Sequence, residues 1–309
     1  MLEFMLPLLS LWDPIEINID PTITEFGPFQ LTWHGVFTAI GIAAGVYVGV
    51  LLGRKEGFTE DDGYGIALVG VPAGIVGARA LWAIENREQI DSFGELFRIN
   101  EGGITVMGAI IGGIIGAVIY GIIRRMPITR GLDAAIFGAL LGMAIGRIGD
   151  IINGEHWGTL TSLPWGIVYT HVDSPGFPYS FDSSLNPTPR HPAVAYELFG
   201  DMIILGILWF VFQRVWKHRP GVTFFLGVTL YSAMRFGLSY LRIDSCASGT
   251  DCPDHLLNNW MTFPQVVSMI TFAIGVAGLI WSLLRAPQDA PPEPMAVSPP
   301  SRAPATGRA

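Results

Sequence analysis

Long runs of apolar residues separated by short polar segments dominate the chain. A transmembrane helix needs roughly 20 mostly apolar residues, and seven runs come close to that length. They cover about 31–53, 63–84, 103–123, 132–152, 192–212, 222–241 and 263–284. The second run is the weakest, because Pro72 and Arg79 interrupt it. A membrane β-barrel would show short alternating strands instead. The pattern therefore predicts an all-α integral membrane protein with seven transmembrane helices.

The composition agrees with a bundle of helices in lipid. Half of the residues are hydrophobic, only 14% are charged, and the 38 glycines suit close helix packing. Residues 1–285 are expected to form a single transmembrane domain that carries a small head at about 153–190. Residues 286–309 are rich in Pro and Ala, which predicts a disordered tail. The first twelve residues carry Glu3 and no basic region. They are interpreted as a segment on the membrane surface, not a signal peptide.

Basic residues orient the predicted bundle. They gather in alternate loops and after the last span, at Arg54, Lys55, Arg124, Arg125, Arg130, Arg214, Lys217, Arg219 and Arg285. The positive-inside rule then places the N-terminus and the head outside and the C-terminus in the cytoplasm. The net charge of −8 comes mainly from acidic residues in the outer segments. The sequence has no basic patch that would indicate nucleic-acid binding.

The most distinctive stretch is Gly146 to Gly158, which ends the fourth apolar run. It places Arg147 and Asp150 at or just inside the membrane. Burying ionisable groups there is costly, which makes both residues candidates for function. The Asn153-Gly154 pair allows the helix to end abruptly and lets the backbone approach a ligand.

Three arginines fall within predicted spans: Arg79, Arg147 and Arg235. Each could pair with a carboxylate and hold the bundle together, and for Arg79 this structural role is as plausible as a functional one. Arg147 and Arg235 lie in the outer halves of their helices, near one membrane level. Two guanidinium groups there suit the phosphate of a lipid headgroup, which they can bind bidentately. Arg242 lies two helical turns beyond Arg235, on about the same face.

Other polar residues leave alternatives open. Glu155 could orient an arginine or accept a proton, or it could cap a helix or form a loop salt bridge. His156 is a weak catalytic candidate, and His191 is expected to order the head. Cys246 and Cys252 could form a disulfide, bind a metal with His255, or remain free thiols.

The stretch from Gly146 to Gly158 resembles the signature of the prolipoprotein diacylglyceryl transferases. Arg190-His191-Pro192 with the following Tyr196-Glu197, and the segment from Tyr231 to Arg235, resemble two further segments of that family. The resemblance covers about 13–284. It implies a seven-span enzyme of the bacterial cytoplasmic membrane. Its substrates would be phosphatidylglycerol and the lipobox cysteine of a prolipoprotein signal peptide. No metal and no organic cofactor is implied.

The resemblance also implies roles for individual residues. Arg147 would bind the lipid phosphate, and Arg235 would be essential. The predicted catalytic residues are Arg235, Glu155, Asp150 and His34, and the predicted substrate-binding residues are Arg147, Asn153, Gly154, Gly158 and Arg242. In the implied reaction, the acceptor thiolate attacks the glycerol carbon that bears the phosphate.

Three positions depart from the family pattern. Asp150 stands where several members have Asn, and His34 of Trp33-His34-Gly35 replaces a functional tyrosine. Met107 stands where many members have His or Tyr, and a thioether takes no proton at neutral pH. His34 is therefore predicted to share in deprotonating the thiol, since an imidazole titrates near pH ~6.5 and neighbouring arginines would keep it neutral. The alternative is an interfacial histidine that bonds water or a backbone carbonyl.

Two other functions compete with this one. A transporter or lipid-binding membrane protein could use the same arginines to hold an anion, although the sequence shows no paired repeats. A catalytically silent relative is the third hypothesis, which Met107 and His34 motivate.

Overall fold

The computed structural model describes residues 13–27, 29–85, 94, 105–214, 219–243, 255–256 and 261–286. Several expectations lie outside these residues. They concern the N-terminal surface segment, the pairing of Cys246 and Cys252, and the tail from 287 onward. Met107 lies in a described helix, but its side chain is outside the described part.

All seven predicted apolar runs are helical. The helices are α2 (Trp33–Lys55), α3 (Glu60–Glu85), α4 (Val106–Ile123), α5 (Ile128–Asn153), α6 (Ala193–Arg214), α7 (Val222–Leu238) and α8 (Phe263–Leu284). In the described residues, α2, α3, α5, α6 and α8 are long and apolar enough to cross a membrane, whereas the apolar parts of α4 and α7 are shorter. The chain is therefore a mostly helical membrane protein, and its seven crossings stay a prediction.

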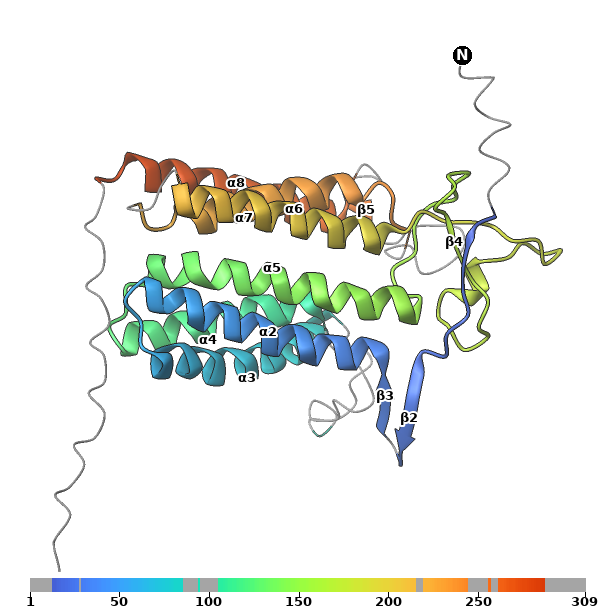
Figure 1. Ribbon diagram of the computed structural model, residues 1–309, viewed down its shortest axis with the longest axis horizontal. Helices are drawn as coiled ribbons and strands as arrows, with labels where there is room; N and C mark the ends of the chain where they lie inside the picture. The colour runs from blue at the N-terminus through green and yellow to red at the C-terminus, as the bar shows by residue number, and fades with distance from the viewer. Residues whose placement is uncertain are drawn as a thin grey trace, which may run out of the picture.

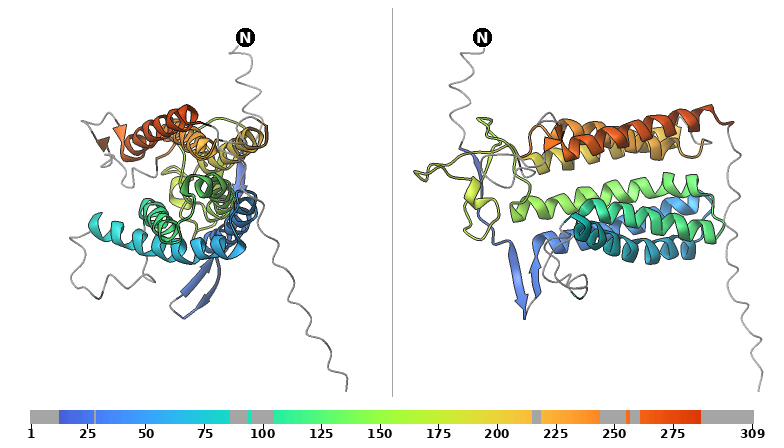
Figure 2. Two further views of the ribbon diagram at one scale, coloured as in Figure 1. Left: turned by 90° about the vertical axis from the view of Figure 1, so that its left-hand side faces the viewer. Right: turned by 180° about the vertical axis from the view of Figure 1, so that it is seen from behind.

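Helix α5 lies in the middle of the bundle, with α2, α3 and α4 on one side and α6, α7 and α8 on the other (Figure 1). The view along the helices shows the same division (Figure 2). The buried core forms where α5 meets α2 and α6, and consists of Leu52, Ala134, Ile136, Phe137, Leu140, Ile204 and Leu208. Large apolar side chains such as Leu68, Ile122 and Ile203 are exposed. This outward apolar surface is what a bilayer requires.

Glycines bring α2 and α5 into close contact. A Cβ added at Gly41 would lie 2.5 Å from the carbonyl oxygen of Gly142, and one at Gly45 would lie 2.6 Å from that of Gly138. Small residues that let two backbones approach in this way are typical of helix packing in lipid. Nearer the end of α5, a Cβ added at Gly149 would lie 2.8 Å from Cα of His34, so the first turn of α2 packs equally closely against the last turns of α5.

The sequence pattern did not predict the short strands. β1 (Ile15–Ile17) pairs in parallel with β4 (Ile167–Tyr169), β2 (Thr22–Phe26) is antiparallel to β3 (Phe29–Thr32), and β5 (His255–Leu256) is antiparallel to β6 (Met261–Thr262). Strands β1 to β4 and residues 154–192 lie at one end of the bundle, which we call the head end (Figures 1 and 2).

Local signals end the helices at the head end. Oγ1 of Thr32 accepts a hydrogen bond from the backbone N–H of Gly35 and caps α2. Helix α5 ends at Gly154, whose φ of +81° lies in the left-handed region. A Cβ at Gly154 would lie 2.2 Å from Oγ of Ser174, so this glycine is needed both for its backbone angle and for space. The last turns of α5 therefore face the head.

Candidate active site

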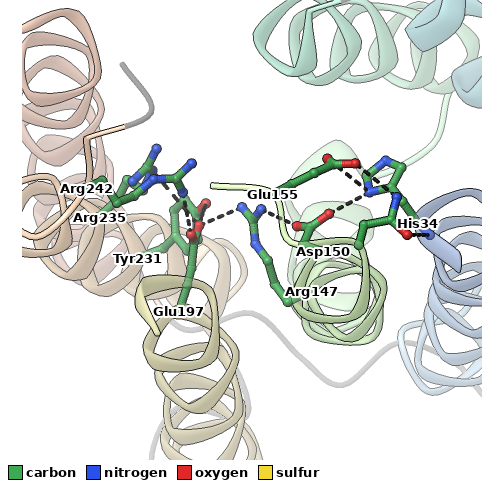
Figure 3. Close-up of polar contacts among 9 residues, drawn as sticks. His34, Arg147, Asp150, Glu155, Glu197, Tyr231, Arg235 and Arg242 are labelled. Atoms are coloured by element: carbon green, nitrogen blue, oxygen red, sulfur yellow. Dashed lines mark hydrogen bonds and ion pairs between the residues drawn. The ribbon is translucent and has the colours of Figure 1, made fainter. Parts of the chain in front are cut away.

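The head ends of four helices meet at one cluster of polar side chains (Figure 3). His34 is in the first turn of α2, whereas Arg147 and Asp150 are in the last turns of α5. Glu197 is near the start of α6, and Arg235 is near the end of α7. Tyr231 and Arg242 complete the cluster from α7 and from the residues that follow it. Residues distant in sequence thus reach one level of the bundle.

Two carboxylates hold Arg147. Its Nη1 donates to Oδ2 of Asp150 at 2.8 Å, and its Nη2 donates to Oε1 of Glu197 at 2.8 Å. The pairing with Asp150 follows the helical spacing of three residues and confirms the contact that the sequence suggested. Asp150 is only 3% exposed, so the charge of this pair is largely withdrawn from solvent.

Glu197 is the centre of the arginine cluster, and the sequence analysis did not select it as a site residue. It is fully buried. Oε1 accepts hydrogen bonds from Arg147 and, at 3.2 Å, from the hydroxyl of Tyr231, while Oε2 accepts one from Nη1 of Arg242 at 3.0 Å. A signal was present, since Glu197 is an acid within an apolar run. The same cost of burial that singled out Arg147 applies to it.

Arg235 lies beside this centre but is less fully paired. Its Nε is 4.0 Å from Oε1 of Glu197. Its Nη1 is buried and has no hydrogen-bond partner among the described residues. An unpaired buried donor costs roughly 1–3 kcal/mol, so this guanidinium group is prepared to receive an anion. The structure thus brings the three predicted phosphate-site arginines, Arg147, Arg235 and Arg242, to one carboxylate.

His34 is held by Asp150. Its Nδ1 lies 2.5 Å from Oδ1 of Asp150 and 3.8 Å from Oε2 of Glu155. The imidazole is 43% exposed, whereas the side chain of Asp150 is 4% exposed. Neighbouring arginines are expected from the sequence to keep this imidazole neutral, but its nearest charged partners in the described residues are carboxylates. The charged groups within 4 Å of Nδ1 are carboxylates, and Arg147 binds the other oxygen of Asp150. The alternative of a histidine bonded only to water or a backbone carbonyl is also wrong.

Of the other predicted residues, Asn153 and Glu155 lie beside this pair, whereas Gly158 lies against His191 and Arg242. Oδ1 of Asn153 accepts from the backbone N–H of His34 at 3.3 Å, and its Nδ2 donates to Glu155 at 3.1 Å. A Cβ at Gly158 would lie 2.2 Å from the carbonyl oxygen of His191, and Gly158 forms a β-bridge with Arg242. These contacts, like those of Gly154, give each residue a role in the fold. Direct contact with substrate stays a prediction.

Residues of the Arg-His-Pro segment order the head, as expected. Nε of Arg190 donates to the carbonyl oxygen of Tyr179 at 2.5 Å, and Nδ1 of His191 lies 3.2 Å from the hydroxyl of Tyr196. Burial lowers the pKa of Arg190 below its usual value. Arg79 of α3 lies over the ring of Trp82 at 4.4 Å, a cation–π contact within one helix, and its role in holding the bundle together stays a prediction.

Within the described ranges, two groups of side chains have the chemistry of metal ligands: His34 with Asp150 and Glu155, and Asp20 with His171 and Asp173. In the first group, the 2.5 Å contact between Nδ1 and Oδ1 leaves no room for an ion between these two atoms, since metal bonds to such ligands are each about 2.0–2.2 Å long. The second oxygen of Asp150 is engaged by Arg147. The first group therefore forms a hydrogen-bond network.

Residues 21–281 match the family model described as prolipoprotein diacylglyceryl transferase. Several relatives carry the name phosphatidylglycerol–prolipoprotein diacylglyceryl transferase. The protein from Clostridioides difficile is 30% identical over 260 residues, which are 84% of this chain and 93% of the relative. A protein from Nostoc sp. is 29% identical over 86% of this chain and 90% of its own length. A protein from Gloeobacter violaceus is 29% identical over 88% of this chain and 96% of its own length.

Proposed function

The chain belongs to the prolipoprotein diacylglyceryl transferase family, and from this premise we propose how its head-end cluster carries out the transfer. The protein is an enzyme that moves the diacylglyceryl group of phosphatidylglycerol to prolipoproteins. Membership in an enzyme family disfavours the transporter hypothesis. The proposal below concerns the acceptor, the roles of individual residues and the placement in the membrane.

The acceptor is the lipobox cysteine of the prolipoprotein signal peptide. Its thiolate attacks the glycerol carbon that bears the phosphate, a carbon–sulfur bond forms, and the bond from that carbon to the phosphate oxygen breaks. The products are a thioether and glycerol phosphate. The thiol proton must leave first, because the thiolate is the nucleophile and a free cysteine has a pKa of about 8.5.

The arginine cluster binds the phosphate. The observation that carries this proposal is the gathering of Arg147, Arg235 and Arg242 around the single buried carboxylate of Glu197, with Nη1 of Arg235 unpartnered in the described residues. Glu197 occupies the arginines in the way that an anion would. The negative charge that builds on the leaving phosphate is then stabilised by groups already in position, an effect that often supplies the largest catalytic contribution.

The bundle crosses the cytoplasmic membrane of a bacterium seven times, with the N-terminus and the head outside and the C-terminus in the cytoplasm. This placement rests on the apolar helices and the alternation of basic loops. The cluster then lies at the outer headgroup level, where phosphatidylglycerol presents its phosphate and where exported precursors emerge.

A single assay tests the proposal. Purified protein is mixed with phosphatidylglycerol and a peptide containing a lipobox cysteine, and mass spectrometry detects the diacylglyceryl thioether and released glycerol phosphate. A peptide with Ser in place of the cysteine is the matched control. Product from the cysteine peptide alone supports the proposal. Lipid movement without product would support the transporter, and neither product nor movement would indicate a catalytically silent relative.

A further inference from the structure

We propose that Asp150 couples the phosphate site to the proton acceptor, so that binding of the lipid phosphate at Arg147 increases the proton affinity of His34. The inference rests on the proposed function and makes His34 a catalytic residue and Asp150 a positioning residue. It begins from the position of one carboxylate between two side chains of different chemistry (Figure 3).

Asp150 uses both of its oxygens. Oδ1 lies 2.5 Å from Nδ1 of His34, and Oδ2 accepts from Nη1 of Arg147 at 2.8 Å. A carboxylate at Nδ1 places the proton of a neutral imidazole on that nitrogen and leaves Nε2 as the acceptor. A half-exposed imidazole oriented by a buried carboxylate is the arrangement by which proteins direct a general base toward a nucleophile.

Other polar and charged groups also face this pair. Glu155 lies 3.8 Å from Nδ1 of His34, and Asn153 binds both Glu155 and the backbone of His34. The side chains of Arg147 and His156 lie close enough to Asp150 to interact with its carboxylate electrostatically. The carboxylates of Asp150 and Glu155 interact in the same way with the hydroxyl of Tyr169. Burial and these two carboxylates raise the pKa of Tyr169, which therefore stays neutral. Asp150 contacts both the imidazole of His34 and the guanidinium of Arg147.

The sign of the coupling follows from competition for Arg147. Its guanidinium neutralises Asp150 and Glu197 in the free protein. A phosphate on the same guanidinium takes part of that positive charge, so Asp150 becomes a stronger partner for a protonated His34. The negative charge of the phosphate acts in the same direction. His34 therefore becomes a better proton acceptor once the lipid substrate is in place.

Linkage makes the effect reciprocal. If lipid binding increases the proton affinity of His34, protonation of His34 must strengthen lipid binding by the same factor. The extra affinity is fully present below the titration midpoint of free His34 and is lost as pH rises through the midpoint of the complex. One linked proton changes the dissociation constant by at most about tenfold per pH unit.

The experiment measures binding of phosphatidylglycerol to the full-length protein in phosphatidylcholine nanodiscs between pH 5 and 8.5. We expect the dissociation constant of the wild type to rise several-fold with pH across this window. His34→Gln should remove the dependence, Asp150→Asn should reduce its slope, and His171→Gln, which changes a histidine of the head, should leave it unchanged. Thermal unfolding of each variant checks that it is folded.

The outcomes separate this inference from the proposed function. If the dissociation constant depends on pH equally steeply in Asp150→Asn and in wild type, the coupling does not pass through Asp150. If the pH dependence persists in His34→Gln, His34 is not the group that takes up the linked proton. If wild type also forms the thioether product, the proposed function stands in either case. Absence of product at every pH would count against the function itself, whatever the binding slopes.

Discussion

Helix α5 carries a buried carboxylate near each end, and the two differ in their partners. Asp133 is 4% exposed and Asp150 is 3% exposed. Oδ2 of Asp133 accepts from the backbone N–H of Gly221 at 2.6 Å, and Oδ1 accepts from that of Phe224 at 2.7 Å. Asp133 thereby caps the start of α7, where the N–H groups lack helical partners. Asp150 instead binds the side chains of Arg147 and His34.

The comparison shows that burial of a charge inside a membrane does not by itself identify a catalytic residue. Backbone amides are fixed in place and do not titrate, so the partners of Asp133 hold α5 and α7 together. An arginine and a histidine can exchange one anion for another or transfer a proton. The partners of Asp150 are therefore suited to bind substrate and move a proton. Substitutions at four positions test this distinction.

The largest effect is expected at Arg147. Arg147→Ala should lower transfer by about 10³-fold or more while the protein still inserts and folds, because the group that stabilises the leaving phosphate is lost. Arg147→Lys should recover little activity, since an ammonium is a point charge without the planar guanidinium donors. Mass-spectrometric product rates measure both. Full activity in the lysine variant would contradict bidentate binding of the phosphate.

Arg235→Ala should produce a loss of about 10²–10³-fold, comparable to removal of one preorganised donor. The loss should be somewhat smaller than at Arg147, because Arg147 keeps its contacts with Asp150 and Glu197 in this variant. The measurement is the rate against phosphatidylglycerol concentration. Near-normal turnover in this variant would show that Arg235 does not bind the phosphate.

Asp133→Ala should change stability instead of chemistry. It leaves the N–H groups of Gly221 and Phe224 without their acceptor, and we expect a loss of about 2–3 kcal/mol. Thermal unfolding in detergent should show a lower midpoint, and product formed per folded molecule should stay within about twofold of wild type. A slower reaction with an unchanged unfolding midpoint would contradict the division between the two carboxylates.

The fold was largely predictable because lipid requires long apolar helices. All seven predicted runs became helices. The pairing of β1 with β4 was not predictable, since it joins Ile15 to Ile167 and no local pattern indicates such a distant partner. The pairing of Arg147 with Asp150 followed from helical spacing, whereas the contact between His34 and Asp150 joins residues 116 positions apart. Glu197 carried a usable signal, because it is an acid in an apolar run, but its three arginine partners converge only in the folded bundle.

The smallest effect is expected from Asp150→Asn, which keeps the shape of the side chain and removes its charge. The amide oxygen can still accept from Nδ1 of His34, but Nδ2 then faces the Nη1 donor of Arg147, so this hydrogen bond is lost and Arg147 keeps Glu197 as its acceptor. Transfer should therefore persist within about tenfold of wild type, or about 1.4 kcal/mol. Asp150→Leu should fail, because it leaves Arg147 and His34 without an acceptor at the base of the site. The measurement compares the transfer rates of the two variants with that of wild type, at equal expression and with equal unfolding midpoints. If the Asn variant were folded but inactive, the charge of Asp150, and not its hydrogen bonds, would be what the reaction requires.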